Sequence, residues 1–144
     1  DIKQGVALAL SNEKKEIAYP LTLAAFRNCI IAGSSSDEIS GGRSKDSSIP
    51  FNYYFSYCLI NSIEEKNDKI VNVIWKKDDN FQLIDKRGEQ LYDFQLTPKS
   101  AAINIGLADD ARNYPQDLKG MPRLEDEAPD AGCYEWKEKT EENE

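Results

Sequence analysis

A segment of about eight residues occurs twice in this chain, and the repeat constrains the fold more than any other feature. Residues 26–33 read Phe-Arg-Asn-Cys-Ile-Ile-Ala-Gly, and residues 55–62, which lie 29 positions later, read Phe-Ser-Tyr-Cys-Leu-Ile-Asn-Ser. Both share Phe, Cys, a branched aliphatic pair and a turn-forming end, which is typical of a strand followed by a corner. Residues 5–12 have a similar alternation, and we interpret them as an earlier, more degenerate copy.

Recurring strands without helices between them predict an all-β fold of one of two kinds. In a solenoid, each unit buries its apolar face against the next unit. In an antiparallel sandwich, tight turns such as Asn-Gly or Asp-Gly join neighbouring strands, and neither dipeptide occurs here. Periodicity alone leaves both architectures open.

The repeating part is expected to span residues 1–96. Alternating apolar and polar residues predict two further strands at 80–85 and 92–96. Two loop excursions are expected to leave this part, at the Gly- and Ser-rich residues 33–50 and at residues 62–79, where β-branched residues in the second half favour a strand. Solenoids commonly use such excursions as binding surfaces.

The remainder of the chain predicts a closing segment and a tail. Residues 97–136 contain four Pro and three Gly, too many for regular structure. We expect them to form an irregular C-terminal cap, because the open end of a solenoid needs a cover. Residues 137–144 contain few side chains that could pack, and predict a disordered tail.

The distribution of charge excludes several functions. Residues 109–144 hold 5 basic and 12 acidic residues, and so carry −7 of the net charge of −8. No basic cluster occurs, so we expect neither nucleic-acid binding nor membrane insertion by this segment. The absence of His excludes His-based acid–base catalysis and His-ligated metal. The start at Asp1, without a signal-like segment, suggests a piece of a longer chain.

Three motifs in the closing segment resemble a known family. Residues 100–106 read Ser-Ala-Ala-Ile-Asn-Ile-Gly, residues 117–123 read Asp-Leu-Lys-Gly-Met-Pro-Arg, and residues 130–135 read Asp-Ala-Gly-Cys-Tyr-Glu. They resemble the ending of right-handed parallel β-helix proteins of secreted or surface-anchored bacterial type, abundant in gut Bacteroidetes. That ending reads Ser-Pro-Ala-Ile-Asp-x-Gly, Asp-x-x-Gly-x-x-Arg, then Asp-Ile-Gly-Ala-Tyr-Glu. The present chain departs from it at Ala101, Asn104 and Cys133.

The resemblance implies right-handed parallel β-helix rungs with an irregular C-terminal cap. It implies a secreted or cell-surface location, associated with the outer membrane in the parent protein, as in lipoproteins and adhesin-like proteins. The expected partners are the remainder of the parent chain and a polysaccharide or another cell-surface molecule. For this segment we expect a structural role with carbohydrate binding or adhesion, rather than enzyme activity. The alternative is part of a polysaccharide lyase or glycoside hydrolase whose catalytic rungs lie upstream.

Stacked rungs would place equivalent residues in ladders, with Phe26 over Phe55 and Cys29 over Cys58. We interpret the cysteines as buried small hydrophobic residues, with a disulfide or a reactive thiol as the alternatives. Arg123 is expected to pair with the carboxylate of Asp117 or Asp130 and to fasten the closing segment. The residues expected to form the cap are Ser100, Gly106, Asp117, Gly120, Arg123, Asp130, Gly132 and Tyr134.

The functional candidates are few. No residue pattern identifies a catalytic group or a bound organic cofactor. Asp109, Asp117 and Asp130 are weak candidates for a Ca²⁺ site, since they offer oxygen ligands on loops but match no EF-hand spacing. Tyr54 and Trp75 are candidates for stacking on sugar rings, although most of the aromatic residues are expected to lie in the core.

Overall fold

The structure is a computed structural model that describes residues 5–84 and 92–138. It confirms the all-β class, because the described chain consists of short strands and one four-residue helix. The sheets have two or three strands each, and none of them is closed. The elements are β1 (Leu8–Ser11), β2 (Glu13–Lys14), β3 (Ile17–Ala18), β4 (Leu21–Arg27), β5 (Ile30–Ile31), β6 (Ile39–Gly42), β7 (Phe51–Ser56), β8 (Leu59–Ile60), β9 (Ile70–Val71), β10 (Ile74–Trp75), β11 (Phe81–Leu83), β12 (Asp93–Leu96) and α1 (Ala108–Ala111).

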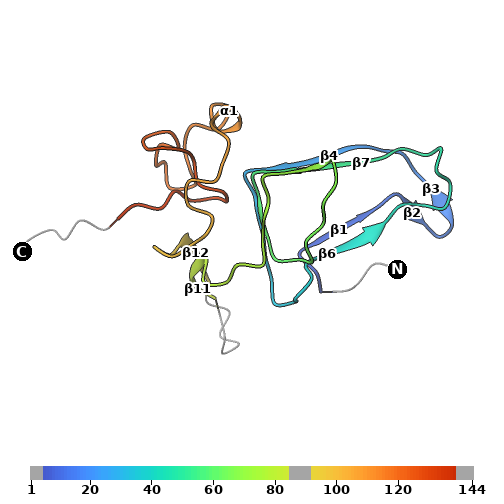
Figure 1. The fold of residues 1–144 in the computed structure, drawn as a ribbon, viewed down its shortest axis with the longest axis horizontal. Helices are drawn as coiled ribbons and strands as arrows, with labels where there is room; N and C mark the ends of the chain where they lie inside the picture. Colours follow the sequence, from blue (N-terminus) through green and yellow to red (C-terminus); the bar gives the residue numbers. More distant parts are fainter. Residues whose placement is uncertain (1–4, 85–91, 139–144) are drawn as a thin grey trace, which may run out of the picture.

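Three parallel sheets form the body of the molecule. β4, β7 and β9 make one sheet, β5, β8 and β10 make a second, and β1 and β6 make a third. In Figure 1 these sheets lie along the top, the side and the bottom of one broad coil, so that successive turns of the chain overlie each other. Parallel pairing is not the pairing of an antiparallel sandwich. The antiparallel pairs are β2 with β3, and β11 with β12.

The two copies found in the sequence stack in register, as predicted. Phe26 pairs with Phe55, and their rings stack with centroids 5.0 Å apart. Ile30 pairs with Leu59 in the next sheet. Each copy was expected to be one strand ended by a corner, but the corner lies inside the copy.

The corner residues adopt left-handed backbone conformations. Asn28 has φ of 50°, Tyr57 of 53° and Asn72 of 51°, and each of them separates two strands of adjacent sheets. Asn is among the residues that tolerate this conformation best, whereas Tyr adopts it at a cost. The N–H of Asn28 still donates to the carbonyl of Ser56 at 3.1 Å, so the stacking continues through the bend.

A third copy spans residues 70–75, where Ile70, Asn72 and Trp75 take the places of Phe55, Tyr57 and Ile60. This copy is not among the repeats predicted from the sequence. The first two copies are 29 residues apart, but the third follows the second after only 15, because residues 61–69 return directly to the top sheet (Figure 1).

Two of the expected assignments are wrong. Residues 5–12 are not an earlier copy of the repeat, because β1 lies in a different sheet from β4 and pairs with β6. Residues 33–50 are not only a loop, because they contain β6, which forms the bottom of the coil. The predicted strands at 80–85 and 92–96 are confirmed in their described parts by β11 and β12. The predicted disordered tail lies outside the described residues from position 139 onward.

Apolar side chains form two clusters on opposite faces of the side sheet. Ile31 and Ile60 point into the coil, where they pack with Phe55 and Cys58. Leu59 points outward and packs with Leu96, Ala102 and Ala131 of the later chain. Both faces are therefore covered, and the side chains of Leu59 and Ile60 are fully buried.

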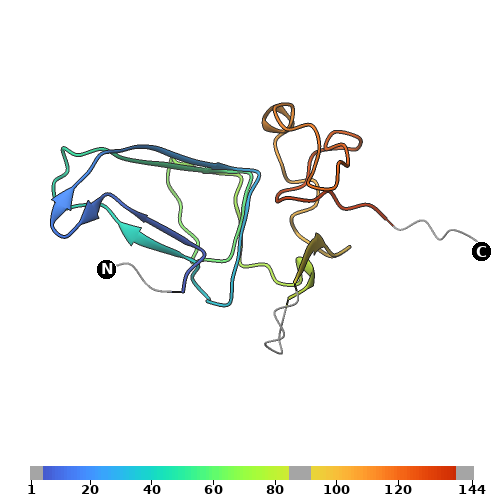
Figure 2. The same ribbon diagram turned by 180° about the vertical axis from the view of Figure 1, so that it is seen from behind.

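The closing segment packs against the outer face of the side sheet (Figures 1 and 2). Asn28 fastens it there: its side-chain amide donates to the carbonyl of Leu107 at 3.0 Å, and its side-chain oxygen accepts the Leu107 N–H at 2.8 Å. The N–H of Gly132 donates to the Asn28 carbonyl at 2.8 Å. The segment thus covers a side of the coil, where the sequence analysis expected it to close an end.

Candidate ligand pocket

A pocket of about 300 Å³ lies inside the coil between the top sheet and β6. It exists because the third turn is short. β9 pairs with β7 only at Phe55 and Ser56. Among the described residues, no strand continues this pairing along Phe51–Tyr54, and none pairs with the outer edge of β6. The space that a longer third turn would occupy is therefore left as a pocket.

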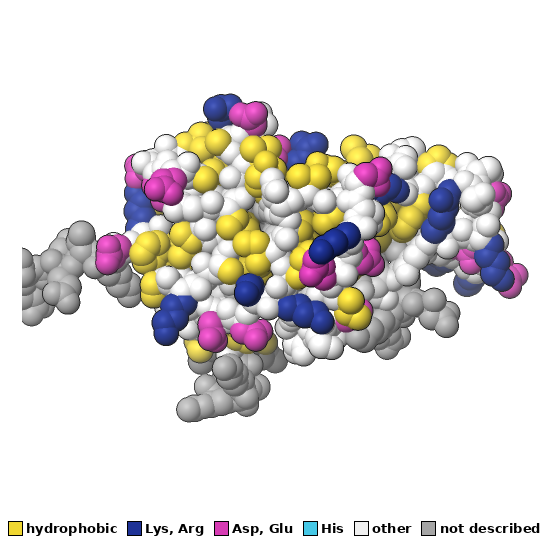
Figure 3. Space-filling model, in the orientation of Figure 1, with side chains coloured by type: hydrophobic (Ala, Val, Ile, Leu, Met, Phe, Trp, Pro, Cys, Tyr) yellow, Lys and Arg dark blue, Asp and Glu magenta, His cyan; other side chains and the backbone are white. Residues whose placement is uncertain are grey.

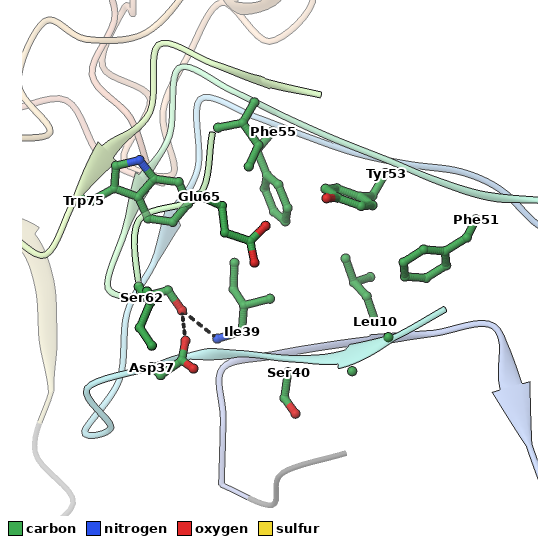
Figure 4. A pocket seen from close by; sticks show the side chains of 14 residues that line it. Leu10, Asp37, Ile39, Ser40, Phe51, Tyr53, Phe55, Ser62, Glu65 and Trp75 are labelled. Carbon is green, nitrogen blue, oxygen red and sulfur yellow. Dashed lines mark hydrogen bonds between the residues drawn. The ribbon is translucent and has the colours of Figure 1, made fainter. Parts of the chain in front are cut away.

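Aromatic side chains form one wall of the pocket. Alternation along β7 points Phe51, Tyr53 and Phe55 into it, with ring centroids 5.7 and 5.8 Å apart (Figure 4). Trp75 enters from β10 at one end. The Tyr53 hydroxyl accepts a hydrogen bond from the Asn67 side chain at 3.2 Å, and Lys69 Nζ lies 5.0 Å from the centre of its ring.

Polar groups from the two loops complete the lining. Asp37 comes from the loop before β6, and Ser62 and Glu65 from the return between β8 and β9. The Ser62 hydroxyl donates to the Asp37 carboxylate and accepts the N–H groups of Glu38 and Ile39 at 3.0 Å each. Its position is therefore fixed, and Ser62 and Asp37 lie side by side in Figure 4.

The structure separates the two residues expected to stack on sugars. Trp75 lines the pocket, but Tyr54 lies on the opposite face of β7, where it pairs with Ala25. Phe51 and Tyr53, which belong to the aromatic residues expected in the core, line the pocket instead. Sequence reasoning missed Asp37, Ser62 and Glu65 individually, although it placed binding surfaces in the loops that carry them.

In the closing segment, two carboxylates organise the backbone. Asp117 accepts the N–H groups of Lys119 at 2.7 Å, Met121 at 2.8 Å and Glu135 at 2.9 Å. Burial acts to raise the pKa of Asp117, but these three hydrogen bonds outweigh it and lower the pKa below its ordinary value. Asp130 accepts N–H groups from Asn104 and Trp136, and there burial prevails and raises the pKa.

Arg123 was expected to pair with Asp117 or Asp130, but in the structure it pairs with Glu135. Its guanidinium contacts the Glu135 carboxylate and donates to the Gly132 carbonyl at 3.1 Å. The prediction failed because the N–H donors of the segment already occupy the two Asp carboxylates. Burial raises the pKa of Glu135 to about 7, against the lowering effects of Arg123 and of the Asp130 N–H.

The other expected cap residues either make contacts that hold the closing segment or allow its backbone to turn. The Ser100 hydroxyl donates to the Asn80 side chain at 3.1 Å, and Lys119 Nζ lies 5.9 Å from the centre of the Tyr134 ring. A Cβ atom at Gly106 would lie 2.7 Å from the Pro129 carbonyl oxygen, so only Gly fits there. Gly120 and Gly132 have φ of 79° and 102°, which favours Gly at both positions.

The three Asp residues considered for a Ca²⁺ site each bond to different partners. Asp109 pairs with Arg112, while Asp117 and Asp130 serve the backbone as described above. In residues 5–84 and 92–138, no three or more Cys, Asp or Glu side chains gather as a metal ion would require. The described chain also has no helix with the length and apolarity needed to cross a membrane.

Comparison of the chain with protein-family models, with curated proteins and with solved structures finds no match.

Proposed function

We propose that the strands of the three parallel sheets form consecutive coils of a parallel β-helix. In-register parallel pairing in three sheets supports this, as do the corner residues that recur in three copies. β1, β4 and β5 have no second strand partner within the described residues, so each presents an edge on which a preceding coil would stack. The resemblance of the closing motifs supports a right-handed sense and a parent protein that lies outside the cell or on its surface.

We infer that the pocket binds a segment of a carbohydrate chain. One observation carries this proposal: a single space of about 300 Å³ is lined by aromatic rings together with carboxylate and hydroxyl groups. Aromatic faces pack against the C–H face of a sugar ring, and carboxylates accept hydrogen bonds from its hydroxyl groups. A volume of about 300 Å³ lies at the small end of ligand sites and suits one or two sugar units.

The charge of the lining favours neutral sugars over uronic acids. Asp37 and Glu65 contribute two carboxylates, and no described Lys or Arg belongs to the lining. A uronate carboxylate there would lie beside like charges without a guanidinium or ammonium partner. Lys69 contacts the Tyr53 ring and the Phe51 carbonyl, but is not part of the lining.

The proposal is tested by titrating the full chain with neutral and uronate oligosaccharides in a calorimeter. Phe51→Ala removes one ring from the lining of the pocket, and we expect affinity for neutral oligosaccharides to fall about tenfold, the usual loss for one stacked ring. Tyr54→Ala is the matched control, because Tyr54 belongs to the same strand but faces away from the pocket. Glu65→Gln, at an exposed position, should weaken binding to neutral sugars and reduce discrimination against uronates.

The same titrations separate the alternatives. Equal losses in Phe51→Ala and Tyr54→Ala, or no binding to any neutral oligosaccharide, would remove the pocket assignment. Preferential binding of uronates, with release of unsaturated product in the presence of Ca²⁺, would instead support the polysaccharide lyase alternative. Release of reducing ends from neutral oligosaccharides would support a glycoside hydrolase, which uses paired carboxylates such as Asp37 and Glu65.

A further inference from the structure

Two cysteines occupy equivalent positions in neighbouring turns of the coil. Cys29 follows the corner residue Asn28, and Cys58 follows the corner residue Tyr57. The strands that follow them, β5 and β8, are parallel and in register, and the Leu59 N–H donates to the Cys29 carbonyl at 2.9 Å. Neighbouring strands lie about 4.8 Å apart, which is within the range of Cα separations in disulfides, roughly 4.4–6.8 Å.

The two thiols also point in the same direction. Cys58 belongs to the apolar cluster inside the coil, and Cys29 packs against that cluster. Cys29 Sγ lies 3.0 Å from the Arg27 carbonyl oxygen, and Cys58 Sγ lies 3.2 Å from the Ser56 carbonyl oxygen, so the side chains repeat the same orientation.

The two members of the pair differ in reactivity. The neighbouring Cys58 thiol lowers the pKa of Cys29 to about 7, against the effect of burial, whereas the neighbouring Cys29 and burial raise the pKa of Cys58. Cys29 is half-buried and Cys58 is fully buried. An oxidant therefore meets Cys29 first, and Cys58 is the adjacent group that completes the reaction.

The rest of the chain offers no comparable pair. Val73 takes the equivalent place in the third copy. Cys133 lies in the closing segment, and burial raises the pKa of its thiol. All three cysteines are free in the structure.

We propose that Cys29 and Cys58 form a disulfide when the protein meets a peroxide, and that this bond joins the first two turns of the coil. The Cys29 thiolate attacks one oxygen of hydrogen peroxide, the O–O bond breaks, and a sulfenic acid and hydroxide form. The Cys58 sulfur then attacks the Cys29 sulfur and displaces its hydroxyl group. That group leaves as water with the Cys58 proton, and the first hydroxide is protonated by solvent. The two thiols lose two electrons, and peroxide is reduced to water.

The test uses the full chain carrying Cys133→Ser, treated with a small excess of hydrogen peroxide under native conditions. Mass spectrometry should show the loss of two hydrogen atoms. Tryptic digestion should give residues 28–43 linked to residues 46–66. The oxidised chain should unfold at a temperature higher by roughly 5–15 °C than the reduced chain, because the bond closes a loop of 29 residues.

Cys58→Ser in the same background is the control, and should stop at the sulfenic acid or at higher oxides of Cys29. Circular dichroism before treatment verifies that each variant is folded. The proposal is overturned if the folded Cys133→Ser chain gains oxygen at Cys29 while Cys58 stays reduced. It is also overturned if the linked peptides appear only after unfolding.

Discussion

At the scale of single residues, the corners carry much of the information in this fold. Asn28, Tyr57 and Asn72 turn the chain in the same way, but only the side chain of Asn28 is bonded to the closing segment, through the backbone of Leu107, among the contacts described above. Asn28 and Asn72 thus both form a left-handed bend, but Asn28 also links the coil to the closing segment.

This difference gives a prediction with an internal control. Asn28→Gly keeps the left-handed bend but removes two hydrogen bonds to Leu107, and should lower the free energy of unfolding by about 1–3 kcal/mol. Asn72→Gly makes the same backbone change at an exposed corner, and should cost only a few tenths of that amount. Urea unfolding of both variants measures the comparison. Equal losses would show that the bend itself, not the Leu107 bonds, determines the cost.

Sequence reasoning predicted the stacking of residues but not the position of the bends. The Phe and Cys positions identified two copies, because ladders of like residues leave a visible repeat. The bend was invisible, because Tyr57 is a residue type that sequence rules place in strands. The third copy was missed because its offset changes from 29 to 15, and because Ile70 and Val73 replace Phe and Cys.

At the scale of elements, the pairing of β1 with β6 depends on a single glycine. Gly41 has φ of 125°, and a Cβ atom there would lie 1.6 Å from the Leu10 carbonyl oxygen. Next to it, a Cβ atom at Gly42 would meet nothing within 4 Å. Sequence rules assigned both residues to a loop, since this pairing is set by a strand 31 positions away.

Substitution of these neighbours by Ala should therefore give very different results. Gly41→Ala forces β1 and β6 apart and should destabilise the fold by roughly 2–4 kcal/mol, with loss of affinity at the pocket that β6 lines. Gly42→Ala should change the free energy of unfolding by less than about 1 kcal/mol. Thermal unfolding and calorimetric titration measure the two effects, and a stable Gly41→Ala chain would contradict the close approach of β6 to β1.

The closing segment contributes a pH dependence through Glu135. Its pKa in the folded chain, about 7, exceeds the ordinary value of 4.5, so the folded chain binds the extra proton between these values. Stability from this group is therefore complete below pH 4.5 and is lost as the pH rises to about 7. Asp130, whose pKa is also raised, acts in the same direction.

We expect the free energy of unfolding to be higher at pH 5 than at pH 8, with a smaller difference in Glu135→Gln. Glu125→Gln is the control, because Glu125 is an exposed carboxylate of the same segment that pairs with Lys137. It should leave the slope unchanged. Urea unfolding across this range supplies the measurement, and an unaltered slope in Glu135→Gln would contradict the assignment to Glu135.

At the scale of the whole molecule, the side sheet joins the coil to the closing segment. Its two faces belong to different apolar clusters, so neither part can lose its structure without exposing this sheet. Charged side chains of both signs are interspersed over the face shown in Figure 3, without a broad patch of one sign. Packing across the side sheet, together with the Asn28 hydrogen bonds and the Arg27–Asp110 ion pair at 3.2 Å, therefore holds the two parts together.

Leu59→Ala tests this coupling. The side chain is fully buried between β8 and the closing segment, and its truncation should cost about 2–5 kcal/mol. Unfolding should remain one transition, whether followed by the fluorescence of Trp75 in the coil or of Trp136 in the closing segment, each observed in a variant with the other Trp replaced by Phe. Two separate transitions in the parent chain would show that the parts fold independently.

The short third turn also bears on how such a chain can change over time. The step of 15 residues, instead of 29, is what leaves β7 partly uncovered and gives the pocket its space. Insertion of about 14 residues within 61–69 would restore a full turn, and its strands would fill the space of the pocket. Gain or loss of the pocket in this architecture thus requires only one insertion or deletion of half a repeat, in the same return segment that supplies Ser62 and Glu65 to the lining.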